Sequence, residues 1–239
     1  MKKIAIYTSI FGSYDNLSNI TYRPENCEFI CFTDSDIQSN DWKIVRVSKL
    51  YNDPVRDAKR YKILPHRYLS EYDISIYMDG NFEIQENITI LVNKYLSGSS
   101  AAFFDHNQQE EYDRRNCIYA EADFIINAGN INMGRWPERG TLNYKDNPVI
   151  IREQVSRYKI EGYPKNNGLI VGGIILRKHN DIDCINAMES WWNEIKYYSK
   201  RDQLSFNYVA WKENFKFNYI PGQTRNSKFF IYRPHDNKK

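Results

Sequence analysis

The sequence of 239 residues predicts an α/β fold: one domain, residues 1–239, with a mainly parallel central sheet flanked by helices. Three observations lead to this prediction. Short apolar runs alternate with helical patterns, as in parallel α/β sheets. Several runs end in polar turn residues. The length suits one large domain with a full core.

The strands are expected in the apolar runs. Paired glycines lie inside the last long one. The expected strands are Lys3–Phe11, ended by Gly12; Glu28–Thr33, followed by Asp34; Ile74–Met78, followed by Asp79-Gly80-Asn81; Ala101–Phe104; and Gly168–Arg177. The C-terminal FIYRPHDNKK is expected to be a strand fragment and a polar tail.

Helical spacing of apolar residues predicts four helices, at Asp53–Ser70, Ile88–Leu96, Asp183–Tyr198 and Ser199–Lys212. Pro65 is expected to kink or split the first one, because proline cannot donate within a helix. Residues 107–149 mix charges, Asn, Gly and Pro, and are expected to be irregular. Long irregular stretches in compact domains are commonly functional.

Composition narrows the classes of function. A net charge of +3 with dispersed basic residues argues against nucleic acid binding. Aromatic residues make up 15%, which suits either a ring-rich core or stacking on sugars. The four cysteines give no complete zinc pattern and are expected to be free thiols in a reducing compartment.

The N-terminus and hydropathy give an expectation about location. The sequence MKKIAIYTSIFGSYD lacks a long apolar core and a cleavage site, so it is interpreted as a strand and not a signal peptide. No run of about 18 apolar residues indicates a membrane span. We expect a bacterial, cytoplasmic protein, either free or peripheral at the inner face of the membrane. The oligomeric state stays open.

Polar groups at strand ends suggest a ligand site. Ligands of open α/β sheets bind at the carboxyl ends of strands. Asp79 follows a buried strand, where a carboxylate could ligate a divalent metal that bridges a diphosphate. Alternatively, Asp79 simply caps a tight turn.

Basic and imidazole side chains could complete such a site. Lys59 and Lys62 precede the Asp79 strand and could neutralise phosphate, or lie on a solvated helix face. His235 could ligate a metal or belong to an unremarkable tail. His106, after the Ala101–Phe104 strand, is a candidate for contact with an acceptor.

Several segments, in this order along the chain, resemble a glycosyltransferase-like family first catalogued as a domain of unknown function, with plant members associated with cell-wall and mucilage polysaccharides. They are TSIFGSYD, CFTD, SIYMDGNFEI, RRNCIYAEAD, EGYPKNNGLIVGGIILRKHN, WWNEI and KRDQLSFNY. That family is similar to family-8-type retaining glycosyltransferases. The resemblance spans roughly residues 4–212 and implies a GT-A (Rossmann-like) fold with a nucleotide-sugar donor, UDP-sugar favoured, and a saccharide acceptor.

The resemblance also implies roles for individual residues. Asp202 and Gln203 resemble the acid–amide pair near the transferred sugar and are the catalytic candidates. Asp79, Asn81 and His235 would hold Mn²⁺ or Mg²⁺. The donor would contact Thr8, Ser9, Tyr14, Asp34, Lys59, Lys62, Asp79, Gly80, Asn81 and the strand glycines Gly172 and Gly173.

One departure from the family-8 pattern affects the metal. Asn81 stands where those enzymes have an acid, and a neutral amide is a weaker ligand for a hard cation. If no metal is used, Lys59, Lys62 and Arg201 could carry the leaving-group charge.

In the expected mechanism, Asp202 stabilises the positive sugar or binds its hydroxyls, and Gln203 positions it. Asp202 could instead be an acid at a helix N-terminus. Replacing Asp202 with Asn is expected to lower turnover by orders of magnitude and leave the fold intact. His106, Arg115, Glu121 and Trp136 are the candidate acceptor contacts, in or near a stretch that could form a lid.

Two other functions stay open. A non-catalytic sugar- or nucleotide-binding module would also explain the aromatic content and the Asn81 departure. A nucleotidyltransferase ranks third, because no Gly-rich phosphate loop follows the first strand.

Overall fold

The computed structural model describes residues 2–110, 113–130 and 146–233 and confirms the expected α/β fold with a mainly parallel sheet. The seven-stranded sheet has the order β3-β2-β1-β4-β7-β6-β8. Its strands are β1 (Ile4–Ile10), β2 (Cys27–Thr33), β3 (Lys43–Arg46), β4 (Ile74–Met78), β6 (Ala101–Asp105), β7 (Ile170–Arg177) and β8 (Asn218–Ile220). A second sheet pairs β5 (Phe82–Ile84) with β9 (Phe230–Tyr232).

One strand of the large sheet runs against the others. β1 is parallel to both β2 and β4, whereas β7 is antiparallel to its neighbours β4 and β6. The carboxyl ends of β1, β2 and β4 therefore share an edge with the amino end of β7. Segments that are distant in the sequence meet at this edge.

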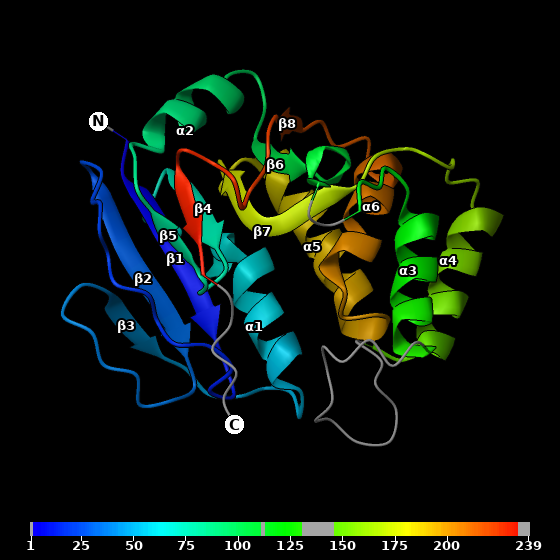
Figure 1. Cartoon of the computed structure of the whole chain (residues 1–239), viewed down its shortest axis with the longest axis horizontal. Helices are drawn as coiled ribbons and strands as arrows, with labels where there is room; N and C mark the ends of the chain where they lie inside the picture. Colours follow the sequence, from blue (N-terminus) through cyan, green and yellow to red (C-terminus); the bar gives the residue numbers. More distant parts are fainter. Residues whose placement is uncertain (1, 111–112, 131–145, 234–239) are drawn as a thin grey trace.

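Helices cover both faces of the sheet (Figure 1). One face packs against α1 (Pro54–Ile63), α3 (Ile118–Asn130), α4 (Pro148–Ile160), α5 (Ile182–Tyr197) and α6 (Phe206–Lys212). The other packs against α2 (Thr89–Tyr95) and the β5–β9 pair. Strand alternation divides the core: Tyr7 enters the first layer, while Ile6 enters the second.

The expected helix at Asp53–Ser70 is split at Pro65. Asp53 caps α1 by accepting from the amide of Val55 at 3.0 Å, and Pro54 is the first helical residue. The helix ends at Ile63, and a 3₁₀ turn, η1 (Pro65–Arg67), follows. The split confirms the expected effect of Pro65.

The expectation of irregular structure at 107–149 is wrong for part of that stretch. A 3₁₀ turn, η2 (His106–Gln108), enters it, and α3 lies within it. Ile118, Ala122 and Ile125 are spaced four and three apart and are buried, so tertiary packing stabilises this helix despite its polar neighbours.

The expected helix at Ser199–Lys212 is shorter. Its first part is a 3₁₀ turn, η4 (Asp202–Leu204), and α6 starts at Phe206. The Ser199 hydroxyl and the Lys200 amide both donate to Oδ2 of Asp146, at 2.7 and 2.8 Å. These bonds hold the chain out of helical geometry before Asp202.

Further elements had no signal in the sequence patterns: α4 and the short strands β3, β5 and β8. All four cysteines are buried and free, as expected. Within the described ranges, no helix combines the length and apolar character that a membrane span requires.

Candidate functional site

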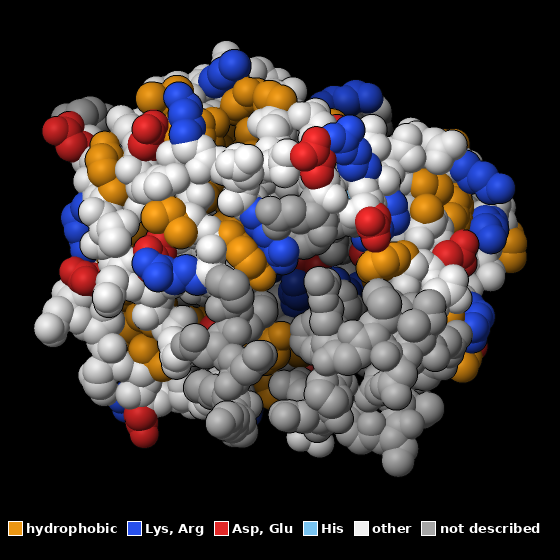
Figure 2. All heavy atoms as spheres, in the orientation of Figure 1, with side chains coloured by type: hydrophobic (Ala, Val, Ile, Leu, Met, Phe, Trp, Pro, Cys, Tyr) orange, Lys and Arg blue, Asp and Glu red, His pale blue; other side chains and the backbone are white. Residues whose placement is uncertain are grey.

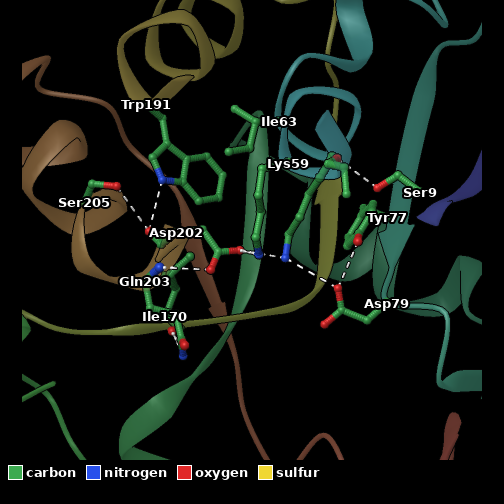
Figure 3. A network of polar contacts seen from close by, with 12 residues as sticks. Ser9, Lys59, Ile63, Tyr77, Asp79, Ile170, Trp191, Asp202, Gln203 and Ser205 are labelled. Atoms are coloured by element: carbon green, nitrogen blue, oxygen red, sulfur yellow. Dashed lines mark hydrogen bonds and ion pairs between the residues drawn. The ribbon is translucent and has the colours of Figure 1, made fainter. Parts of the chain in front are cut away.

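Four charged side chains meet at the sheet edge where β1 and β4 end (Figure 3). Lys59 and Lys62 come from α1, Asp79 follows β4, and Asp202 begins η4. The Nζ atoms of the two lysines lie 2.6 and 2.7 Å from the same oxygen, Oδ2 of Asp202. Nζ of Lys62 also lies 3.6 Å from Oδ1 of Asp79. The expected catalytic acid, metal-site acid and helix cations are thus one connected group.

The local sequence explains why the two lysines act together. Positions three apart share a helix face, so α1 directs Lys59 and Lys62 to the same side. Both side chains are largely buried, with exposed fractions of 18% and 2%. The hydroxyl of Tyr77, on the same strand face as Asp79, donates to Oδ1 of Asp79 at 2.9 Å.

Burial and opposite charge set the protonation of this group. Burial alone would raise the pKa of Asp202, but Lys59 and Lys62 outweigh it and hold the pKa far below its usual range. Burial lowers the pKa of Lys59 to about 8, against the opposing effect of Asp202. For Lys62, burial is outweighed by Asp202 and Asp79, and the pKa is raised.

The backbone of β7 closes over the ion pair. A Cβ atom added at Gly172 would lie 2.8 Å from Oδ2 of Asp202 and 3.2 Å from Nζ of Lys62. One added at Gly173 would lie 3.3 Å from Oδ2 of Asp79. A side chain at Gly172 would therefore displace the charged groups, and one at Gly173 would crowd Asp79.

Asp202 is also held through its backbone and its neighbour. Its carbonyl accepts from the indole N–H of Trp191 at 3.1 Å, and its Oδ1 accepts from the amide of Gln203 at 3.2 Å. The side chain of Gln203 donates to the carbonyl of Ile170 at 3.2 Å. Asp202 and Gln203 are therefore fixed against β7 in the conformation described.

Other candidates lie on β1 and after the ends of β1 and β2. The Ser9 hydroxyl donates to the carbonyl of Ala58 on α1 at 2.9 Å. Thr8 is fully buried, and strand alternation directs its side chain to the face of β1 opposite Ser9, so its donor contact stays a prediction. Asp34 accepts from the amide of Gly12 at 2.9 Å and pairs with Lys49 at 3.0 Å. Tyr14 is exposed in the loop after β1.

The turn after β4 is fixed by backbone contacts. The amide of Asp79 donates to the carbonyl of Gly173 at 2.8 Å, and the Asp79 carbonyl accepts from Phe82 at 3.0 Å. Gly80 lies against Ile10, where an added Cβ would come within 3.2 Å of its Cδ1 atom. Asn81 is mostly buried, and its carbonyl accepts from the amide of Arg233 at 2.8 Å.

These residues do not fit a resident divalent cation. Oδ1 of Asp79 accepts from the Tyr77 hydroxyl and lies near the Lys62 ammonium. Oδ2 of Asp202 is paired with both lysines. Across 2–110, 113–130 and 146–233, no three His, Cys, Asp or Glu side chains gather as a metal site. His235, an expected ligand, lies outside the described residues.

Three of the four expected acceptor contacts lie together. Nε of Arg115 donates to Oε2 of Glu121 at 2.6 Å, and the Arg115 amide donates to Nδ1 of His106 at 3.3 Å. Burial lowers the pKa of His106. His106 and Glu121 are buried, so direct contact with an acceptor needs a rearrangement, and the role stays a prediction. Trp136 lies outside the described residues.

Two contributors were missed in the sequence. Tyr77 stands two positions before Asp79, and strand alternation could have indicated the shared face. Arg177, fully buried at the end of β7, donates to the Lys62 carbonyl at 2.7 Å and to the Tyr7 hydroxyl at 2.5 Å. A charge ending a buried apolar strand was the available signal.

The surface is hollowed near this edge. Figure 2 shows a depression near the middle of the face, with basic side chains at its floor. A separate polar groove borders the turn after β4, lined by Asp15, Asn16, Leu17, Ser18, Asn19, Thr21, Gly80, Asn81, Glu83 and Arg233. A small ligand could reach the Asp79 turn from the groove side.

Residues 30–233 match the family model described as TOD1/MUCI70, glycosyltransferase-like domain. A similar curated protein is the "Probable hexosyltransferase MUCI70" of Arabidopsis thaliana, 24% identical over 235 residues, covering 90% of this chain and 38% of the relative. The chain thus spans about two fifths of that relative's length. Among solved structures, the apo structure of the WbbM bifunctional glycosyltransferase aligns with a TM-score of 0.46 and 8% identity, covering 92% of this chain and 39% of that one.

Proposed function

The chain belongs to the TOD1/MUCI70 glycosyltransferase-like family, and from this premise we propose that it transfers a sugar from a nucleotide-sugar donor, with a UDP-hexose favoured, to a saccharide acceptor. One observation carries the proposal. Lys59, Lys62, Asp79 and Asp202 form one charged group at the edge of the sheet where ligands of α/β folds bind.

The reaction requires opposite charges to be stabilised close together. The bond between the anomeric carbon and the diphosphate oxygen breaks, and its electron pair leaves on the diphosphate. The acceptor hydroxyl oxygen bonds to the anomeric carbon, and one proton is released. Preorganised cations at the leaving oxygen lower the barrier to such a step.

The residues take complementary roles in this proposal. Lys59 and Lys62 stabilise the negative charge on the diphosphate. Asp202 holds both lysines and contributes negative potential near the sugar, and Gln203 positions the sugar. Asp34 and the Gly12 backbone, joined at 2.9 Å, are the proposed contacts of the nucleoside.

UDP release from a panel of UDP-hexoses, with and without saccharide acceptors, tests the activity. We expect at least one UDP-hexose to be consumed, and consumption to fall strongly in Lys59→Met. The matched control Lys94→Met removes a lysine from α2, away from the site, and should behave as the unmodified protein. Mass analysis of the product gives the sugar and its linkage.

A second candidate is a binding module without turnover. The contacts of Asp202 favour this candidate, because its carboxylate already accepts from both lysines and from the Gln203 amide. UDP binding without consumption of any UDP-hexose, even over long incubation, would favour this candidate.

Finer expectations remain proposals of their own. The sequence suggests five such properties: retention at the anomeric carbon, a role in surface polysaccharide synthesis, a bacterial source, a cytoplasmic location and action as a single domain. Product stereochemistry by NMR and fractionation of the producing cell would test the first and the fourth.

A further inference from the structure

We propose that the ammonium group of Lys59, supported by Lys62, binds the diphosphate directly and that no resident divalent cation on Asp79 is needed. This inference rests on the proposed function, because it concerns the nucleoside diphosphate of the donor. It departs from the metal site expected from the sequence.

Lys59 and Lys62 supply the positive charge of the site. Two ammonium groups share a single oxygen of Asp202, and Lys62 has a second carboxylate partner in Asp79, 3.6 Å away. Among the described residues, Lys59 pairs with no carboxylate other than Asp202. Its side chain is 18% exposed, against 2% for Lys62, so Lys59 is the lysine that an entering anion reaches first.

The surroundings of Asp79 are unfavourable for a divalent cation. A hard divalent cation prefers several oxygen ligands, commonly including carboxylates. Asp79 offers one carboxylate, and Nζ of Lys62 lies 3.6 Å from its Oδ1 atom. A cation bound there would lie close to this positive charge and be repelled. The neighbouring Asn81 can supply only a neutral amide oxygen.

Lys62 is held rigidly by its neighbours. Nζ of Lys62 lies 4.7 Å from the centre of the Tyr77 ring, and the backbone of Gly172 closes over it. The carbonyl of Lys62 accepts from Tyr7 and Arg177, both at 2.7 Å. The lysine is thus fixed before any ligand arrives, and a fixed charge needs little reorganisation to stabilise an anion.

Calorimetric titration of UDP into the whole chain at pH 7 tests the proposal. One arm contains EDTA and the other excess Mn²⁺. We expect the two dissociation constants to agree within about threefold. Lys59→Met should weaken binding in EDTA by about tenfold to a hundredfold, as expected for a lost charge-assisted hydrogen bond, whereas Lys94→Met should not.

The outcomes separate the two proposals. UDP binding that appears only with Mn²⁺ would overturn the proposal that the lysines bind the diphosphate without a metal, and it would leave the proposed function standing. Absence of UDP binding in both arms would overturn both. Circular dichroism checks that Lys59→Met is folded, and Lys59→Arg, which keeps the charge, should retain most of the affinity. A Lys59→Met variant that is folded and binds UDP normally in EDTA would also overturn the proposal that Lys59 binds the diphosphate.

Discussion

Nζ of Lys62 lies 2.7 Å from Oδ2 of Asp202, and the two side chains are only 2% and 5% exposed. Lys59 approaches the same oxygen from one helical turn away, at 2.6 Å. The acid expected from the sequence to act on the sugar is therefore also a structural counter-ion for two buried cations.

Asp202→Asn is predicted to impair both turnover and stability. Breaking a buried ion pair by removing one partner costs about 3–5 kcal/mol, because the remaining charge is left uncompensated. For a chain of this length we expect the melting temperature to fall by about 10 °C. This revises the sequence-based expectation of an intact fold. The matched control is Asp36→Asn, which removes a carboxylate that is 91% exposed and should change the melting temperature by about 1 °C or less. An unchanged melting temperature in Asp202→Asn would contradict the ion-pair argument.

UDP affinity is predicted to fall at alkaline pH. Burial lowers the pKa of Lys59 from 10.5 to about 8, so its ammonium is mostly present below pH 8 and lost above it. Because the anion needs the charged form, the dissociation constant should rise by about tenfold between pH 7 and 9. Titrations in EDTA at several pH values measure it. Lys59→Arg should abolish the rise, since a guanidinium stays protonated; the same rise in that variant would assign the titration to another group.

Arg177→Met is predicted to destabilise the end of α1. Arg177 donates to the Lys62 carbonyl at 2.7 Å and approaches the Ile63 carbonyl at 3.4 Å, and no carboxylate among the described residues pairs with it. The partial negative charge of a helix C-terminus stabilises such a cation. Its removal leaves buried carbonyls with fewer donors and should cost about 2–4 kcal/mol in urea unfolding. Tyr7→Phe, which removes the hydroxyl that donates to the same carbonyl and accepts from Arg177, should cost about 1–2 kcal/mol. Equal effects of the two substitutions would argue against a special role for Arg177.

Gly172→Ala is predicted to weaken UDP binding. The added Cβ would lie 2.8 Å from Oδ2 of Asp202, which forces the carboxylate and both lysines to shift. We expect a loss of affinity of about tenfold, read by the same calorimetric titration. Gly98→Ala is the comparison, because an added Cβ there meets nothing within 4 Å and only the backbone at φ +80 is strained. Wild-type affinity in Gly172→Ala would show that UDP binding tolerates displacement of Asp202 and the two lysines.

Local patterns predicted much of the fold. The apolar runs of β1, β2, β4, β6 and β7 and the break at Pro65 could be identified from neighbouring residues alone. Short strands and α3 could not, because their stability comes from partners distant in the sequence; α3 forms by burying Ile118 and Ile125.

The sequence by itself determined that Asp79 follows the end of β4. It also determined that the two lysines lie three positions apart in α1 and so share a face of that helix. Only the tertiary structure decided that Asp202 pairs with both lysines and that Arg115 and Glu121 bind each other. The physical reason is that local pattern fixes the direction of a side chain along its own element. Charge pairing depends on distances between elements, and these are set when the antiparallel β7 and η4 pack against α1.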